Sequence, residues 1–208
     1  MEPVKAAIIY YSSTGTVHNL AQAIAEGAEK AGATVRLRKI RELAPPEAID
    51  ENAAWRTHVQ DTADVTEASL DDLAWADVVL FGTPTRYGNP ASQLGAFINT
   101  TYPLWSQGAL AGKVYSAFTA RTTAHGGQES TILALANTFY HWGGVIVAPG
   151  YTDPIQFRSG NPYGTSHVSA DGPPNDVALA AARHQAHRAV DTAAALKAGR
   201  ATQETIPR

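Results

Sequence analysis

The segment from Ala6 to Thr16 most constrains how this chain can fold. Ala6 to Tyr11 is an unbroken apolar run, which is typical of a strand buried on both faces of a parallel sheet. Polar residues 12–16 end the run, and apolar residues then recur every three or four positions up to Gly32. These are Val17, Leu20, Ala21, Ile24, Ala25 and Ala28. The order predicts a strand, a polar loop and a helix.

The same alternation continues along the chain. Further strands are expected at 34–40, 77–81, 114–118 and 145–147, and helices over 91–98, 132–140 and 175–198. Arg36 and Arg38 alternate with apolar residues, which indicates a partly exposed edge strand. Asn175 or Asp176 is expected to cap the last helix. The pattern predicts an α/β fold with a five-stranded parallel sheet and helices on both faces.

Two segments lack this periodicity. Residues 43–69 contain Pro45-Pro46 and scattered acids, and we expect a long surface connection in which a short helical turn can form. Residues 150–174 are rich in Gly, Pro, Asn and Ser. No internal repeat is visible, so residues 1–208 are expected to form a single domain.

Composition excludes several function classes. With 44% hydrophobic and 17% charged residues, the chain should form a folded core, and a net charge of -3 gives no basic surface for nucleic acid. The absence of cysteine excludes thiol chemistry, and no HExxH motif or His/Asp cluster suggests a metal. Without a signal peptide or a membrane-spanning run, we expect no membrane partner and a cytoplasmic location.

Two loops carry candidate chemistry. Residues 12–16, between the first strand and helix, offer free backbone N–H groups, a helix dipole and hydroxyls to a phosphate. They lack the glycine spacing of a dinucleotide site and the lysine of an NTPase loop, which favours a monophosphate. An ordinary helix cap explains this loop equally well. Residues 82–90, after the third strand, supply an aromatic ring, a guanidinium and rigid turns that suit a flat heteroaromatic ring.

Together these loops resemble a known family. Tyr10-Tyr11-Ser12-x-x-Gly15 and Gly82-Thr83-Pro84-Thr85-Arg86-Tyr87-Gly88-Asn89 are similar to the WrbA family of NAD(P)H:quinone oxidoreductases, which have a flavodoxin-like fold. Further matches follow in family order: Leu104-Trp105, Gly108-Ala109-Leu110, His125-Gly126-Gly127-Gln128-Glu129, His141, and Asn161-Pro162-Tyr163-Gly164. The resemblance covers nearly the whole chain except the region from Pro45 to Thr66.

The resemblance implies an FMN site built from three loops and a neighbouring subunit of a homotetramer. The phosphate would be held by Ser12, Ser13, Thr14, Gly15, Thr16 and Val17, and the isoalloxazine lined by Thr85, Arg86 and Tyr87. The third loop would supply Thr119, Ala120, Arg121, Thr122, Gly126 and Gly127. His141 would reach the flavin from the neighbouring subunit, and Trp105 would cover the acceptor side.

The implied reaction is a ping-pong hydride transfer from NADH or NADPH through the flavin N5 to a quinone, with no catalytic protein residue. Two alternatives stay open: a one-electron carrier of the flavodoxin type, which usually needs a more acidic surface, and a homologue that retains the fold only as a scaffold. Thr14, beside the nicotinamide site, replaces a larger residue of the family. Arg121 lies in a loop of usually small residues, where it either faces solvent or favours the reduced flavin.

Other large or titratable side chains are assigned structural roles. His18 is expected at the surface without a role, because a cation gains nothing at a helix start. Trp55, Trp75 and Trp142 are interpreted as packing or interface residues rather than cofactor contacts. His184 and His187 are expected to face solvent on the last helix.

Overall fold

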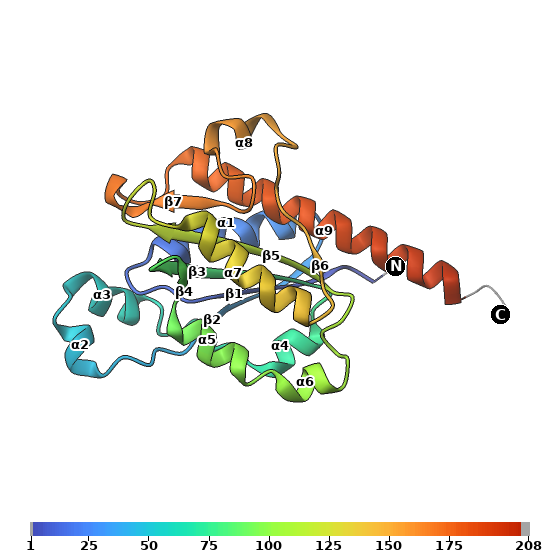
Figure 1. Ribbon diagram of the computed structural model, residues 1–208, viewed down its shortest axis with the longest axis horizontal. Coiled ribbons are helices and arrows are strands. Elements are labelled where there is room, and N and C mark those ends of the chain that lie inside the picture. Colours follow the sequence, from blue (N-terminus) through green and yellow to red (C-terminus); the bar gives the residue numbers. More distant parts are fainter. Residues whose placement is uncertain (1, 205–208) are drawn as a thin grey trace.

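The computed structural model describes residues 2–204, which form a central sheet between two helical layers (Figure 1). Its main path has the order β2-β1-β3-β5-β6, and all neighbours in it are parallel. These strands are β1 (Lys5–Tyr10), β2 (Thr34–Lys39), β3 (Val78–Arg86), β5 (Val114–Arg121) and β6 (Val145–Ile146). The five expected strands are therefore confirmed, with β2 at the edge.

The expected number of strands is too small. Two short strands join the sheet: β4 (Asn89–Pro90) pairs antiparallel with β3, and β7 (Ser166–Val168) pairs in parallel with the end of β5. The described sheet thus has seven strands. Both additions lie in Gly- and Pro-rich stretches and are too short to show periodicity.

Alternation along the strands divides the core between the two faces. On β1, Ile8 and its alternate neighbours pack against α1 (Thr16–Lys30) and α9 (Asp176–Glu204), whereas Ile9 faces the other layer. That second layer contains α4 (Leu70–Trp75), α5 (Ser92–Asn99) and α7 (Gln128–His141). The expected doubly wound arrangement is confirmed.

Helix α9 packs in close contact with helix α1. A Cβ atom at Gly27 of α1 would lie only 2.5 Å from the backbone oxygen of Arg183 in α9, so only glycine permits this approach. Asn175 accepts a hydrogen bond from the Ala178 N–H at 3.0 Å, which confirms one of the two expected caps. The helix runs to Glu204, beyond the expected end at 198.

Residues 43–69 are more structured than expected. They contain α2 (Pro46–Asp50) and α3 (Ala53–Asp61), which lie together beyond one end of the sheet in Figure 1. Glu42 ties this segment to the body, because its carboxylate accepts hydrogen bonds from the Trp55 indole (3.0 Å), the Tyr11 hydroxyl (2.8 Å) and the Gln93 amide (2.9 Å). The connection therefore holds two helices where little regular structure was expected. Its anchor could not be read from a local pattern, because Glu42 contacts residues far from it in the sequence.

A buried glutamine fixes the carboxyl end of β5. The Gln185 amide of α9, which is 1% exposed, donates to the Ser116 hydroxyl (2.7 Å) and the Ala117 carbonyl (2.8 Å). Its oxygen accepts from the Thr165 N–H at 2.7 Å, and the Thr165 carbonyl accepts from the Thr119 N–H at 3.0 Å. This network positions the segment before β7 against β5.

The remaining elements are short. They are α6 (Tyr102–Ser106), α8 (Pro154–Ser159) and a 3-10 turn (Ser169–Asp171). Trp142 packs among Phe81, Tyr115 and Phe139, which confirms its expected packing role. Within residues 2–204, none of the helices is both long and apolar enough to cross a membrane.

Candidate functional site

A polar pocket of about 300 Å³ opens at the carboxyl ends of β1, β3 and β5. In open α/β sheets this edge is where ligands bind. The pocket brings together ten of the predicted site residues: Ser12, Ser13, Thr14, Thr16, Val17, Thr85, Arg86, Ala120, Arg121 and Thr122. Residues from three separate loops therefore meet at one place, as expected for adjacent parallel strands.

The loop after β1 presents an uncapped helix end. Gly15 adopts the left-handed conformation with φ of 94°, and no described side chain caps α1 there. The Ser12 hydroxyl accepts a hydrogen bond from the Gly15 N–H at 3.1 Å, which fixes the turn. N–H groups of the first helical turn thus remain available to a phosphate, whose charge the helix dipole would stabilise.

The β3 end forms the second wall. The Thr85 and Thr119 side chains are fully buried, and their hydroxyl oxygens lie 2.9 Å apart, which ties β3 to β5. Arg86 extends toward residues 12–16, the loop after β1, which we call the phosphate loop. Its guanidinium lies 3.4 Å from the Ser13 hydroxyl. Tyr87 stands outside this pocket: it is 95% exposed and has a left-handed φ of 51°.

Arg121 forms the third wall and is partly buried. Its side chain crosses Gly126 so closely that a Cβ atom there would lie 2.2 Å from Cγ of the arginine. One terminal guanidinium nitrogen lies 3.5 Å from the Thr85 carbonyl, and Nε is buried without a hydrogen-bond partner in the described chain. Of the two interpretations, the inward one fits this placement better, because the lack of a side chain at Gly126 leaves room for the arginine.

The electrostatic character of this pocket fits FMN. The described residues that line it include two arginines and six hydroxyl side chains from 12–16, 85 and 122, but no carboxylate. A phosphate dianion would gain from the arginines and the helix end, and a ring carbonyl or nitrogen would accept from the terminal nitrogens of Arg121. The residues present thus match a ligand with one anionic end and an acceptor-rich ring.

Several predicted residues lie elsewhere in the single chain. Gly15 borders an adjoining hollow, whereas Thr119, Gly126 and Gly127 do not line the polar pocket. The Trp105 indole donates to the His141 carbonyl at 3.0 Å, so these two residues do lie together. His141 ends α7, however, about 20 Å along that helix from its start at Gln128.

Four residues that line the pocket were not among the predicted site residues: Asn52, Trp55, Pro84 and Ser169. Trp55 was interpreted as a packing or interface residue, yet it borders the pocket from the start of α3. Asn52 caps α3 by accepting from the Trp55 N–H at 3.2 Å. Asparagine is a preferred residue at the start of a helix, so Asn52 was a signal in the sequence that a helix begins there.

His18 and His58 line the adjoining hollow of about 580 Å³, which lies between α1 and α3. His18 Nδ1 lies 2.5 Å from the Tyr10 hydroxyl, and its ring centre lies 5.4 Å from that of His58. Burial lowers the pKa of His58 to about 4, with His18 and Lys39 acting in the same direction. The pKa of His18 is also lowered, chiefly by burial. The expected surface position of His18 is corrected to a half-buried one, because its ring packs beside Tyr10 and beside His58 of α3.

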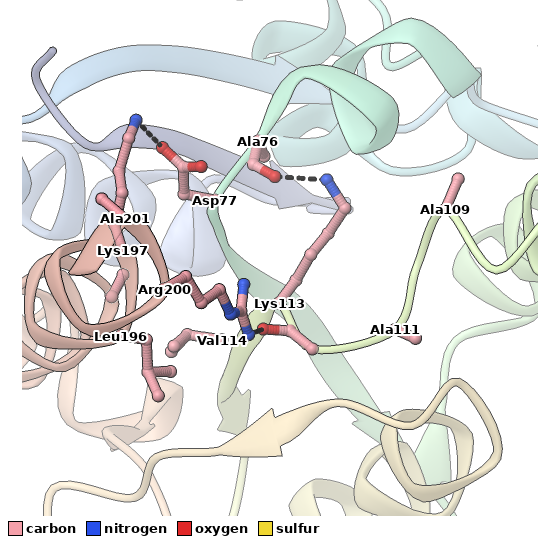
Figure 2. A pocket seen from close by; sticks show the side chains of 12 residues that line it. Ala76, Asp77, Ala109, Ala111, Lys113, Val114, Leu196, Lys197, Arg200 and Ala201 are labelled. Carbon is pink, nitrogen blue, oxygen red and sulfur yellow. Dashed lines mark hydrogen bonds and ion pairs between the residues drawn. The ribbon is translucent and has the colours of Figure 1, made fainter. Parts of the chain in front are cut away.

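A cavity of about 410 Å³ lies at the opposite edge of the sheet, beside the amino ends of β3 and β5 (Figure 2). Its cations already have protein partners: Lys113 donates to the Ala76 carbonyl, Lys197 pairs with Asp77 at 3.0 Å, and Arg200 donates to a backbone carbonyl. These interactions join α9 to the amino edge of the sheet and satisfy carbonyls at the carboxyl end of α4, so we assign this cavity a role in packing. We therefore place the candidate site at the carboxyl edge.

Comparisons with known proteins agree with this geometry. Residues 4–154 match the family model for NADPH-dependent FMN reductase. The chain is 49% identical to an NAD(P)H dehydrogenase (quinone) from Deinococcus radiodurans, covering 93% of this chain and 98% of the relative. A second such protein, from Geotalea uraniireducens, is 40% identical over 93% of this chain and 99% of its own length.

Solved structures show the same fold. The flavodoxin WrbA-like protein from Agrobacterium tumefaciens superposes with a TM-score of 0.64 at 22% identity, covering 92% of this chain and 98% of that one. A flavodoxin from the domain Archaea gives a TM-score of 0.59 at 18% identity, with 93% and 99% coverage. The fold is therefore flavodoxin-like, and the match over residues 4–154 together with the 49% identical relative shows that this chain belongs to the NADPH-dependent FMN reductase family.

Proposed function

We infer that this protein binds FMN and reduces quinones at the expense of NADH or NADPH. The observation that carries the inference is the pocket where an uncapped helix end, two arginines and several hydroxyls converge without a carboxylate. Two relatives that align over nearly their full length are NAD(P)H dehydrogenases (quinone). Bound FMN supplies a ring that takes a hydride from the nicotinamide and returns it to the quinone.

The residues of the chain bind and orient the participants. We propose that Ser12 to Val17 hold the phosphate, with Arg86 bridging from the second loop. Thr85, Tyr87 and the loop from Thr119 to Gly127 frame the ring, partly through their backbone. Because the flavin would carry the hydride from one substrate to the other, the two substrates are expected to use the same open side of the pocket in turn, which gives ping-pong kinetics.

The outer wall of this site is proposed to come from a second copy of the chain. His141 and Trp105 lie together but about one helix length from the pocket, so only a neighbouring subunit could bring them to it. We therefore expect a homotetramer of about 88 kDa, four times 22.0 kDa. Since NAD(P)H is the donor, the cytoplasm is the expected compartment.

An anaerobic titration tests this function. The purified protein is loaded with FMN, reduced stepwise with NADH or NADPH, and then mixed with benzoquinone while flavin absorbance is followed. We expect about one FMN per chain, full reduction, and reoxidation on adding the quinone, with parallel double-reciprocal plots in the steady state. A protein that takes up no FMN overturns the proposal. Reduction by one electron without turnover would favour the carrier function.

A further inference from the structure

The guanidinium of Arg121 has few partners within the described chain. Its Nε is buried and makes no hydrogen bond there, and the group makes only one long contact, 3.5 Å to the Thr85 carbonyl. Because Nε has no accessible surface, a ligand would meet the terminal nitrogens of this side chain, which lines the pocket. An acceptor in the pocket would therefore gain a charge-assisted hydrogen bond from these nitrogens without displacing a good one.

The position of Arg121 in the sheet indicates which part of FMN it meets. The phosphate loop follows β1, whereas Arg121 ends β5, and β3 lies between these strands. Two strand spacings amount to about 10 Å, so Arg121 stands well away from the helix end that suits the phosphate. Arg86, by contrast, reaches the phosphate loop at Ser13. Both guanidinium groups lie near the Thr85 carbonyl, but of the two it is Arg86 that contacts the phosphate loop, which leaves Arg121 for the ring.

The side chain is also held in place. It crosses Gly126, where any Cβ atom would collide with it, and Gln128 fixes the same loop by accepting from the Gly126 N–H at 3.0 Å and donating to the Thr123 carbonyl at 3.0 Å. No described residue that lines this pocket carries a carboxylate to neutralise the cation. Arg121 therefore presents an uncompensated positive charge in a fixed direction.

Resting on the proposed function, we propose that Arg121 binds the pyrimidine edge of the FMN ring through the terminal nitrogens of its guanidinium and holds the reduced ring more tightly than the oxidised one. Hydride transfer moves two electrons and one proton to the ring, and the donor becomes NAD(P)⁺. The ring consequently gains one negative charge, which is spread over this acceptor edge. A fixed cation stabilises that charge and leaves no need for a second proton.

The midpoint potential of bound FMN tests the proposal. In Arg121→Gln, reduced FMN should lose about tenfold more affinity than oxidised FMN, because a hydrogen bond to a charged partner is the stronger kind. For a two-electron couple this lowers the midpoint potential by about 30 mV. Arg121→Lys should restore part of the shift, and Arg41→Gln, which removes an exposed arginine, should cause none.

The outcomes separate this proposal from the proposed function. The potential is measured during reduction with dithionite and a reference dye, so it does not depend on turnover. If FMN binds to Arg121→Gln with an unchanged potential, or if both redox forms are weakened equally, Arg121 does not discriminate between them and the inference fails alone. If Arg121→Gln binds no FMN, the smaller, uncharged Arg121→Ala decides: a wild-type potential in that variant refutes discrimination. A wild-type protein without FMN would refute both proposals.

Discussion

The histidine pair beneath the phosphate loop should make the stability of the fold depend on pH. His58 is 9% exposed and its folded-state pKa is about 4, whereas an unfolded histidine titrates near 6.5. At pH values between these two pKa values, His58 is protonated in the unfolded chain but not in the folded chain. The free energy of unfolding is therefore highest above about pH 6.5 and falls as the pH drops toward 4.

The size of the effect follows from the two pKa values. The contribution of His58 falls by about 2 kcal/mol between about pH 7.5 and about pH 5, since each unit of pKa shift corresponds to about 1.4 kcal/mol. Replacing His58 by Gln removes this titration. The variant should be less stable near neutral pH because packing against His18 is lost, and the difference from wild type should shrink by about 2 kcal/mol at the lower pH.

Urea unfolding followed by circular dichroism at several pH values measures this difference directly. Carboxylates whose pKa values are lowered, such as Glu42 and Asp72, also destabilise the fold in acid, but they do so in both proteins and cancel. His187→Gln, at an exposed site on α9, controls for the loss of any imidazole. Parallel pH profiles for wild type and His58→Gln would refute the reasoning.

Three further predictions concern the pocket and its supports. Thr16→Leu should weaken FMN binding at least tenfold by blocking the phosphate, whereas the exposed Thr66→Leu should not; equal affinities would move the phosphate elsewhere. Trp55→Ala should weaken FMN binding about tenfold through lost aromatic contact, and unchanged fluorescence titrations would show that the indole does not touch the cofactor. Gln185→Ala should lower the free energy of unfolding by about 3 kcal/mol, since three buried groups lose a partner. The exposed Gln22→Ala should change it by less than about 0.5 kcal/mol, and similar values for the two would contradict that account.

Sequence patterns predicted those parts of the fold that local chemistry determines. Ile8 and Ile9 lie in a continuous apolar run, so a strand buried on both faces was recognisable, and its polar loop followed directly. β4 and β7 contain two and three residues, too few for any periodicity. That the chain as a whole forms one domain stays a prediction.

The site was predictable to the extent that it depends on strand ends. The loops after β1, β3 and β5 meet because neighbouring parallel strands end at one edge. The place of Trp55 could not be predicted, because its indole is tied to Glu42, thirteen positions earlier, through a contact that no local pattern encodes. The inward turn of Arg121 depends similarly on the space above Gly126.

The close contact of Gly27 with Arg183 has a consequence for the order of events during synthesis. The helix whose first turn would bind the phosphate packs along its length against α9, which is synthesised about 150 residues later. Until α9 docks, much of the apolar face of α1 stays exposed to water and its amino end lacks a fixed direction. FMN is thus expected to bind only after α9 has been synthesised and has docked, and a chain shortened before residue 183 should bind no flavin even when flavin is in excess.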